Sequence, residues 1–290
     1  MNKKLLKLLP VLLAAFAGLS VKADPPVPNT IAAESYHLQD LELGGTTRTD
    51  RWLAMNQFNY EQGYYGYNGA LAAKAWTYAM KPNFPSAGST AVFNKGTLTN
   101  GDGSTRQPNG YPALEGIYTL FTRTPFILTE SSPLADLNSI SFQIYLTTGG
   151  SDTTSGTSTE AYGPDGDLYQ LPSLNLVTNT GSLSLAASTS SLTKSVPYEF
   201  DHSAGGVETT FTIYENYRLF QWDLSSVTGS ILSFDITFAT YEHVSLRSIQ
   251  LDQSTALIAV PEPAAAALIT ASGVLAFLFL RRRAQPLSRS

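Results

Sequence analysis

The sequence predicts an all-β protein: an antiparallel two-sheet sandwich of jelly-roll-like form, preceded by a signal helix and followed by a transmembrane helix. Charged residues make up only 14% of the chain, while Ser, Thr, Gly and Tyr are plentiful, which suits strands and turns better than helices. Several runs alternate apolar and polar residues with a period of two, as strands with one buried and one wet face do. Turn-forming residues separate these runs, which favours a two-sheet sandwich.

The first residues have the parts of a secretory signal peptide. A basic start overlaps an apolar run over 5–19, and Val21-Lys22-Ala23 follows; the basic residues are Lys3, Lys4 and Lys7. Small residues at the −3 and −1 positions predict cleavage after Ala23. The alternative is an uncleaved anchor helix, but the apolar run is short for a membrane span and contains Pro10. We therefore expect residues 1–23 to be removed on export.

Residues 24–255 are the predicted β-sandwich ectodomain. Alternation of period two predicts strands at 139–146, 182–185, 208–214, 217–224, 231–238 and 245–251, the last with a bulge. In one of them, the residues expected on the buried face are Leu232, Phe234, Ile236 and Phe238. Turns are expected at 100–104, 163–167 and 203–206. Residues 147–160 are mostly Gly, Ser and Thr and predict a loop, while 71–80 suits a helix or a strand equally.

The C-terminal segment, 256–290, has three parts in a fixed order. Pro261, Glu262 and Pro263 come first, an uncharged apolar stretch over 264–280 follows, and a basic cluster closes the segment at Arg281, Arg282 and Arg283. The apolar stretch is at the short end of the membrane-spanning range, and a helix is the one way for a single segment to satisfy its backbone in lipid. The basic cluster should stay on the cytoplasmic side, so the ectodomain lies outside.

This order of parts resembles the PEP-CTERM sorting signal, and the resemblance covers the C-terminal tail alone. It implies an exosortase, an integral-membrane processing enzyme, as the partner that recognises the tail and cuts near the Pro-Glu-Pro motif. It also implies a Gram-negative host that makes exopolysaccharide. The same tail is catalogued as the C-terminal domain of certain ice-binding proteins, which implies no ice-binding activity for the ectodomain. The alternative is a plain stop-transfer anchor that is never processed.

Charge and cysteine content exclude several classes of partner and chemistry. The chain has a formal charge of −5, but its two ends hold eight basic residues and one acidic residue, so the ectodomain is near −12. Such a charge argues against nucleic acid or anionic lipid as a partner. It attracts divalent cations or cationic polymers, or simply keeps the protein soluble. The chain has no cysteine, which excludes disulfides, thiolate zinc sites and cysteine nucleophiles.

No residue qualifies as catalytic from the sequence. Hydrolysis of sugars needs two carboxylates that face each other across the scissile bond. Glu199 and Asp201 would share a face of a strand, but a turn at the following glycines explains them equally well. The histidines His37, His202 and His243 form no metal-binding pattern, and the chain contains no Gly-x-Ser-x-Gly or phosphate-binding motif.

Two weaker sites remain. Tyr64, Tyr65 and Tyr67 interleave with glycines and are candidates for stacking on sugar rings, although packing at a sandwich edge explains them as well. Asp165 and Asp167 lie in a Gly-rich turn and are the best candidates to bind calcium, the one cofactor we consider. Asx turns account for the same residues without a metal.

Three functional hypotheses follow. The first is a non-catalytic protein, exported through the inner membrane and sorted to the cell surface or extracellular matrix, with exopolysaccharide as its expected contact. The second is a secreted glycan-active enzyme, a lyase or hydrolase on a jelly roll, which would need a cleft lined by tyrosines and convergent polar groups. The third is a calcium-dependent adhesive module, in which Asp165, Asp167 and another oxygen converge at about 2.3–2.6 Å from one point.

Overall fold

A computed structural model of the chain describes residues 38–258, apart from gaps at 62, 67–75, 77–78, 100–103, 107, 109, 114–115, 120–122, 153–158, 162 and 205–206. The predicted signal peptide and the predicted transmembrane helix at 264–280 lie outside the described residues. Within the part that is described, no helix has the length and apolar character needed to cross a membrane.

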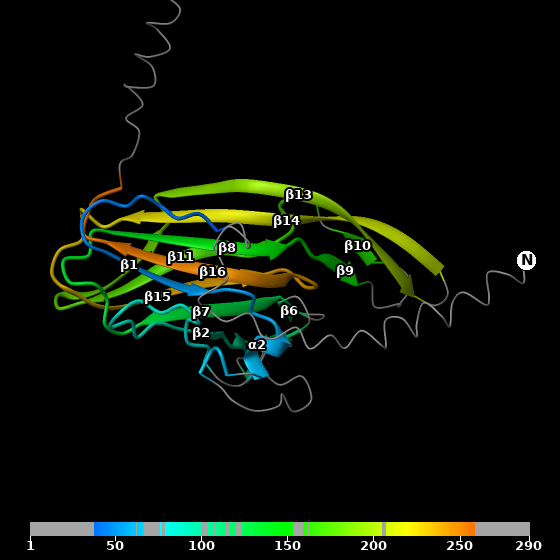
Figure 1. Ribbon diagram of the computed structural model, residues 1–290, viewed down its shortest axis with the longest axis horizontal. Coiled ribbons are helices and arrows are strands. Elements are labelled where there is room, and N and C mark those ends of the chain that lie inside the picture. Colours follow the sequence, from blue (N-terminus) through cyan, green and yellow to red (C-terminus); the bar gives the residue numbers. More distant parts are fainter. Residues whose placement is uncertain are drawn as a thin grey trace, which may run out of the picture.

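The described residues form two large antiparallel sheets, which confirms the predicted all-β class (Figure 1). The seven-stranded sheet has the order β13 (Thr189–Ala204), β14 (Val207–Asp223), β8 (Ser139–Thr147), β16 (Ser245–Ser254), β6 (Ile117–Thr119) and β5 (Gly110–Pro112), and β1 (Thr47–Trp52) also pairs with β16. The five-stranded sheet has the order β12 (Gly181–Ala186), β11 (Leu168–Thr178), β15 (Ile231–Thr240), β7 (Thr124–Glu130) and β2 (Val92–Lys95).

Smaller elements complete the described fold. Two short antiparallel pairs lie apart from the large sheets: β9 (Gly150–Asp152) with β10 (Thr159–Ala161), and β3 (Leu98–Thr99) with β4 (Thr105–Arg106). A single helical turn, α2 (Gln57–Glu61), follows β1. The β9–β10 pair lies in the segment predicted as a loop, so that prediction is corrected for its two ends.

One apolar core joins the two sheets. The rings of Phe93 and Phe126, from the five-stranded sheet, are stacked at 5.4 Å, and Phe126 lies 5.3 Å from Phe238 in the same sheet. Phe238 in turn contacts Phe142 of the seven-stranded sheet, with ring centroids 5.6 Å apart. All four rings are essentially unexposed. This shared core is compatible with a sandwich of two sheets.

The predicted strands agree with the observed ones in four cases. The runs at 139–146, 182–185, 231–238 and 245–251 lie within β8, β12, β15 and β16, and the expected bulge in β16 falls between Leu246 and Ser248. The runs at 208–214 and 217–224 were expected as separate strands, but they form the single strand β14, because Glu215 and Asn216 stay paired on both sides. Leu232 was expected in the core but is 53% exposed, at the start of β15.

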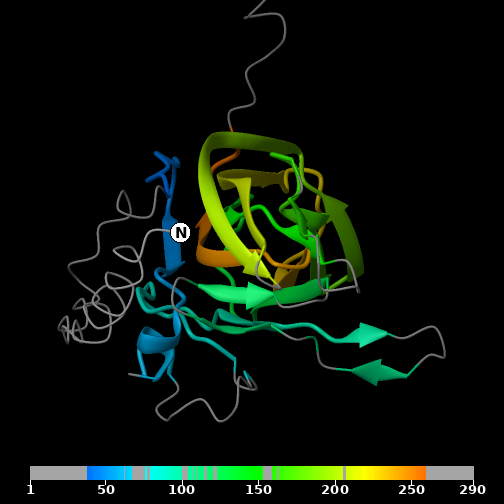
Figure 2. The ribbon, with the colours of Figure 1, turned by 90° about the vertical axis from the view of Figure 1, so that its right-hand side faces the viewer.

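The chain passes from the five-stranded sheet to the seven-stranded sheet between β12 and β13. Only two residues separate β12, which pairs with β11, from β13, which pairs with β14. At this crossing the Ser188 N–H donates to the Gln221 carbonyl at 2.7 Å, and the Trp222 indole donates to the Leu185 carbonyl at 3.2 Å. Figure 2 shows the strong curvature of β13 beyond this point. The crossing closes one side of the core between the sheets.

The outer face of the seven-stranded sheet differs from the expected wet face. On β8 the outward residues Ser141, Gln143 and Tyr145 are only 1%, 4% and 6% exposed. Leu38, from the segment before β1, packs in the same apolar cluster as Tyr145. The neighbouring backbone of residue 39 exchanges two hydrogen bonds of 2.7 Å with the Gln143 amide. Period-two alternation therefore identified the buried face of β8 but not the cover on its polar face.

Candidate functional site

One end of the two sheets gathers aromatic and charged side chains from segments far apart in the sequence. We call this group the aromatic end and define it by Tyr111, Tyr118, Arg123, Tyr169, Tyr241, Glu242 and His243. Tyr111 and Tyr118 lie on β5 and β6, and Tyr169 is the second residue of β11. Residues 241–243 lie in the turn between β15 and β16. The pairing of the strands brings these side chains together, because they lie near strand termini at the same end of the sheets.

A buried threonine holds the turn between β15 and β16 in place. The Thr119 hydroxyl donates to the Tyr241 carbonyl at 2.9 Å and accepts from the Val244 N–H at 3.0 Å. The Thr119 carbonyl also accepts from the His243 N–H at 2.5 Å. His243 has a φ of +61°, a left-handed conformation that few residues other than glycine adopt without cost. This anchoring fixes where Tyr241 points.

Arg123 and two tyrosines form the exposed part of the aromatic end. The Arg123 guanidinium lies 3.9 Å from the centre of the Tyr169 ring and 5.8 Å from that of Tyr241. The two rings meet edge to face, 5.5 Å apart at 78°. Arg123 also pairs with Glu242 at 3.9 Å. Tyr169 is 49% exposed, so a large part of its ring and phenol is open to a ligand.

A second aromatic group continues the same end. The Tyr118 hydroxyl hydrogen-bonds His243 Nδ1 at 2.6 Å, and Tyr111 lies edge-on to Tyr118 with centroids 6.3 Å apart. These three side chains are half-buried. Aromatic rings that carry polar tips offer an apolar face and hydrogen bonds together, which is what a sugar ring requires of a binding surface.

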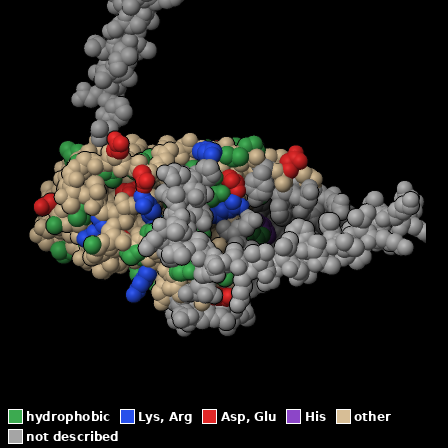
Figure 3. All heavy atoms as spheres, in the orientation of Figure 1, with side chains coloured by type: hydrophobic (Ala, Val, Ile, Leu, Met, Phe, Trp, Pro, Cys, Tyr) green, Lys and Arg blue, Asp and Glu red, His purple; other side chains and the backbone are tan. Residues whose placement is uncertain are grey.

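Charged side chains do not form a patch of one sign around the visible face of the protein. On the face shown in Figure 3, acidic and basic side chains of the described residues are interspersed. Local contacts, rather than a broad electrostatic field, therefore characterise the charged groups visible there.

A second polar network lies on the outer face of the seven-stranded sheet. The rings of Tyr145 and Tyr217 stack at 4.4 Å, and Arg247 donates to the Tyr145 hydroxyl at 2.7 Å while pairing with Glu215. Burial raises the pKa of both tyrosines. Both rings are nearly unexposed and share an apolar cluster with Leu53. The network therefore has the residue types of a catalytic site but lacks the open access that a polymer substrate needs.

The structure pairs both predicted calcium ligands with an arginine. Arg218 Nε donates to Asp167 Oδ2 at 2.5 Å, and its Nη2 donates to Asp165 Oδ1 at 3.1 Å. The Asn216 amide also donates to Asp167 Oδ2, at 2.8 Å. Asp167 is buried and Asp165 is exposed. The guanidinium thus supplies the positive charge that calcium would bring. No group of three or more His, Asp or Glu side chains suited to a metal occurs among the residues described.

Of the predicted glycan-contact tyrosines, the two that the structure describes do not form an exposed platform. Tyr65 is fully buried, and its hydroxyl donates to the carbonyls of Leu53 and Ala54 at 2.6 and 2.7 Å, so the prediction that it stacks on sugars is corrected. Tyr64 is half-buried and packs against the core. Tyr67 lies outside the described residues.

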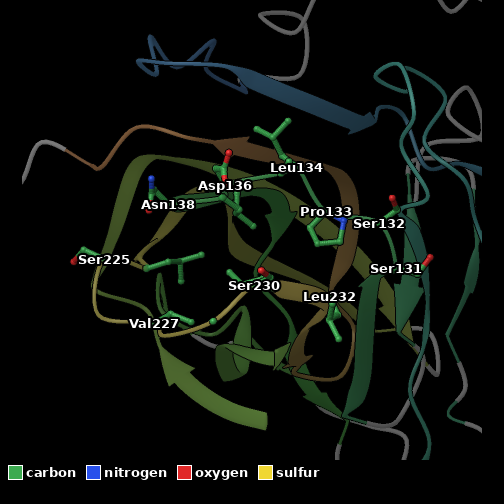
Figure 4. A pocket seen from close by; sticks show the side chains of 15 residues that line it. Ser131, Ser132, Pro133, Leu134, Asp136, Asn138, Ser225, Val227, Ser230 and Leu232 are labelled. Atoms are coloured by element: carbon green, nitrogen blue, oxygen red, sulfur yellow. The ribbon is translucent and has the colours of Figure 1, made fainter. Parts of the chain in front are cut away.

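The opposite end of the sheets contains a pocket of about 620 Å³ (Figure 4). The loop from β7 to β8 lines one side and the loop from β14 to β15 lines the other. Its walls mix hydroxyl and apolar groups, as with Ser131, Ser230 and the exposed Leu232. Asp136, also in the wall, has a φ of +55°.

The sorting residues lie outside the described part of the chain. These are the cleavage position Ala23, the motif Pro261, Glu262 and Pro263, and the basic cluster Arg281, Arg282 and Arg283. Sequence reasoning considered His243 only as a possible metal ligand. It missed the other members of the aromatic end, which are Tyr111, Tyr118, Arg123, Tyr169, Tyr241 and Glu242. Their one shared signal is position beside the ends of apolar runs, which becomes meaningful only when the strand order is known.

Comparison with known proteins adds no relative. No family model, curated protein or solved structure matches this chain. Functional inference therefore rests on the geometry of the aromatic end and on the two terminal segments of the sequence.

Proposed function

We propose that the chain is an exported, membrane-sorted protein of the cell surface or extracellular matrix whose ectodomain binds exopolysaccharide through the aromatic end. Two terminal segments support this location: the predicted signal peptide at 1–23 and the PEP-CTERM-like tail at 256–290. An exosortase-type enzyme is the expected processing partner, and the protein has no catalytic role. The ectodomain charge near −12 favours a neutral glycan over an acidic one.

One observation carries the choice of binding surface. Tyr169 presents an aromatic ring that is 49% exposed, with a guanidinium 3.9 Å from its centre and a second ring at its edge. An exposed tyrosine ring offers a flat apolar surface with a polar tip, which suits the apolar face of a pyranose ring. By contrast, Tyr145 and Tyr217 on the outer sheet face are nearly unexposed.

We also infer that the two sheets form a jelly-roll sandwich. The supporting feature is the pairing order: β1, β16, β8 and β14 are neighbours in one sheet, and β7, β15, β11 and β12 are neighbours in the other. Successive long strands alternate between sheets, from β7 to β8, from β8 to β11, and from β14 through β15 to β16. Eight strands in two such layers are the plan of a jelly roll, with β13 continuing β12 across the gap.

The binding proposal is tested with exopolysaccharide from the native host. Full-length protein and the variants Tyr169→Ala and Tyr241→Ala are compared by affinity electrophoresis in gels that contain the polymer. We expect each variant to bind about two- to tenfold more weakly, the range that corresponds to losing one aromatic contact. Equal retardation of the wild type and both variants would contradict the proposed surface.

Leu232→Ala is the matched control. Leu232 is similarly exposed, at 53%, and lies at the other end of the same strand β15 that leads to Tyr241. Its removal should leave glycan binding unchanged. A loss as large as that of Tyr169→Ala would move the binding surface to the pocket end of the protein.

A glycan-active enzyme is the second candidate, and one observation favours it. The Arg247, Glu215 and Tyr145 network on the outer sheet face combines a cation, a carboxylate and a phenol. If this network is catalytic, incubation with the wild-type protein should shorten the polymer chains, and Arg247→Ala should abolish this shortening. We expect the polymer to keep its length, measured by size-exclusion chromatography, with wild-type protein.

A further inference from the structure

A charged cluster lies inside the protein where β7 ends. On β7 the inward side chains include Phe126, and the last inward position is occupied by Glu130 instead of an apolar residue. On β1, Trp52 points into the same core, and Asp50 and Arg48 are the preceding residues on that side of the strand. Asp50 and Glu130 are both 0% exposed. Two carboxylates therefore stand at core positions of opposing sheets.

Glu130 is strongly bonded at one oxygen and weakly at the other. Its Oε1 accepts from the Thr90 hydroxyl and from the Ser132 N–H, the latter at 2.9 Å. Among the described residues, the partners of its Oε2 are the Gln253 amide at 3.4 Å and Arg48 Nη1 at 3.8 Å. The second oxygen thus keeps capacity for a further, stronger contact.

Asp50 has one oxygen with no hydrogen-bond partner. Its Oδ1 accepts from the Ser86 N–H at 2.7 Å, but its Oδ2 is buried without a partner. Burial raises the pKa of Asp50 and the charge of Glu130 raises it further, against lowering by the Ser86 N–H, the Ser89 hydroxyl and Arg48. These are the titratable and charged groups that act on it from the neighbouring elements.

The charges of this cluster do not balance. Among the described contacts of the two carboxylates, Arg48 supplies the single positive charge against two negative charges. A buried charge without compensation is strongly unfavourable in a protein interior, so it is normally neutralised by a cation or a proton. One more positive charge at this cluster would therefore neutralise the second carboxylate.

We propose that this cluster binds one hard metal cation, of the Ca²⁺ or Na⁺ kind, between the unpartnered Oδ2 of Asp50 and the weakly bonded Oε2 of Glu130. Carboxylate and hydroxyl oxygens are the ligands such cations prefer, and the hydroxyls of Ser89 and Thr90 lie beside the two acids. Two carboxylates are fewer than most all-acid sites provide, so hydroxyl and carbonyl oxygens complete the ligand set. The side chain of Arg48 is 14% exposed and lies at the outer side of the cluster.

Two residues that line the pocket of Figure 4 also lie beside this cluster. Ser131 and Ser132 line the pocket, and the same two residues contact the cluster. The Ser132 carbonyl accepts from Arg48 Nη1 at 2.6 Å, and the Ser131 hydroxyl lies 3.0 Å from that of Thr90. The cluster lies at the end opposite to the aromatic end, so its test is independent of glycan binding.

The test is metal-dependent thermal stability of the full-length chain in a mild detergent. The protein is stripped with EDTA, exchanged into choline chloride, and melted by circular dichroism with CaCl₂, NaCl or neither added. At about 100 times the Kd of the ion, we expect Tm to rise by roughly 5–10 °C with one of the two salts. Atomic emission of desalted wild-type protein should show about one ion per chain if Ca²⁺ is the ligand.

Two variants locate the effect. Asp50→Asn and Glu130→Gln should each weaken the apparent affinity at least about tenfold, since each removes a ligand charge. Asp165→Asn, which removes an exposed carboxylate of the other acidic turn, should keep the full rise in Tm. Wild-type protein that shows no rise with either salt, or a rise that Asp50→Asn retains, would overturn the proposal. Stability that responds to pH alone would assign the missing charge to a proton, which also overturns it.

Discussion

At the scale of single residues, most interior charges are matched by a specific partner, and Arg218 is the clearest case. Its guanidinium spans Asp167, which is 1% exposed, and Asp165, which is 88% exposed, so it connects the interior to the surface of the 163–167 turn. Asp167 also accepts from the N–H of Leu168, which follows it. One side chain therefore fixes the turn that leads into β11.

Replacing Arg218 should expose how much this pairing contributes. Arg218→Ala leaves the buried Asp167 carboxylate without its cation, which we expect to lower the free energy of unfolding by about 3–5 kcal/mol. Urea denaturation measures this loss, and the double variant with Asp167→Ala should recover part of it. A calcium site at Asp165 and Asp167 would give a different result: Arg218→Ala would bind calcium more tightly and recover its stability when calcium is added.

Asp252 makes stability depend on pH with a definite sign. Burial raises its pKa above 3.8, against lowering by hydrogen bonds from Thr49, Gln250 and Gln143 and by Arg51. The folded chain therefore binds this proton more tightly than the unfolded chain. The resulting stability is fully present below pH 3.8 and is lost as the pH rises to the higher folded pKa.

The variant Asp252→Asn isolates this effect, because its side chain stays neutral at every pH. The free energy of unfolding of the variant minus that of the wild type should therefore increase as pH rises above 3.8. Urea melts at several values between about pH 3 and 7 measure the difference. A difference that stays constant, or that decreases with pH, would be inconsistent with a raised pKa.

Single-residue roles were the least predictable from the sequence. Tyr65 and Tyr169 are the same residue type beside similar turn signals, yet one is fully buried and the other is 49% exposed. Exposure depends on which strands become neighbours, and a local sequence pattern does not contain that information. Arg218 likewise lies in a run that alternates correctly, but its two partners come from a turn about fifty positions earlier.

At the scale of elements, loops from different sheets lock against one another at the aromatic end. The loop after β8 places Gly149 against the turn between β15 and β16, where a Cβ on Gly149 would overlap the Glu242 carbonyl oxygen. Backbone cannot yield there as a flexible side chain could. Glycine at 149 thus allows the turn that carries Tyr241 to approach β8.

We expect Gly149→Ala to displace this turn. The overlap should cost about 1–3 kcal/mol of stability, and glycan binding should weaken because Tyr241 moves away from Tyr169. Thermal melts and affinity electrophoresis measure the two effects. Gly163→Ala is the matched control, because a Cβ at Gly163 meets nothing within 4 Å. If Gly149→Ala binds and melts like the control, the turn does not depend on this close approach.

Long strands were predictable and short ones were not. Period-two alternation over eight residues identified β8 and most of β15 and β16, because a buried face must repeat every second residue. Strands of two or three residues, such as β4 to β6, are too short to show a period. The break expected between 214 and 217 failed for a different reason: pairing with β8 and β13 on both sides keeps β14 extended.

At the scale of the whole molecule, the aromatic end and the pocket lie at opposite ends of the two sheets. The aromatic end faces one direction along the strands, and the pocket with its interior carboxylates lies at the other end of β7 and β15. The sequence predicts a signal peptide before the two sheets and contains an apolar segment with a basic end after them. This arrangement suits a protein that is held or released at a surface while one end of its sandwich contacts a polymer.

The most direct test of this account is the mass and location of the protein in its native host. Cells are fractionated into inner membrane, outer envelope and exopolysaccharide matrix, and the intact mass of the chain is measured in each. We expect a mature species that begins near Asp24 and ends near Pro261, found with the exopolysaccharide and absent from the inner membrane. A species that retains Arg281–Arg283 and stays in the inner membrane would contradict sorting and reduce the tail to an anchor.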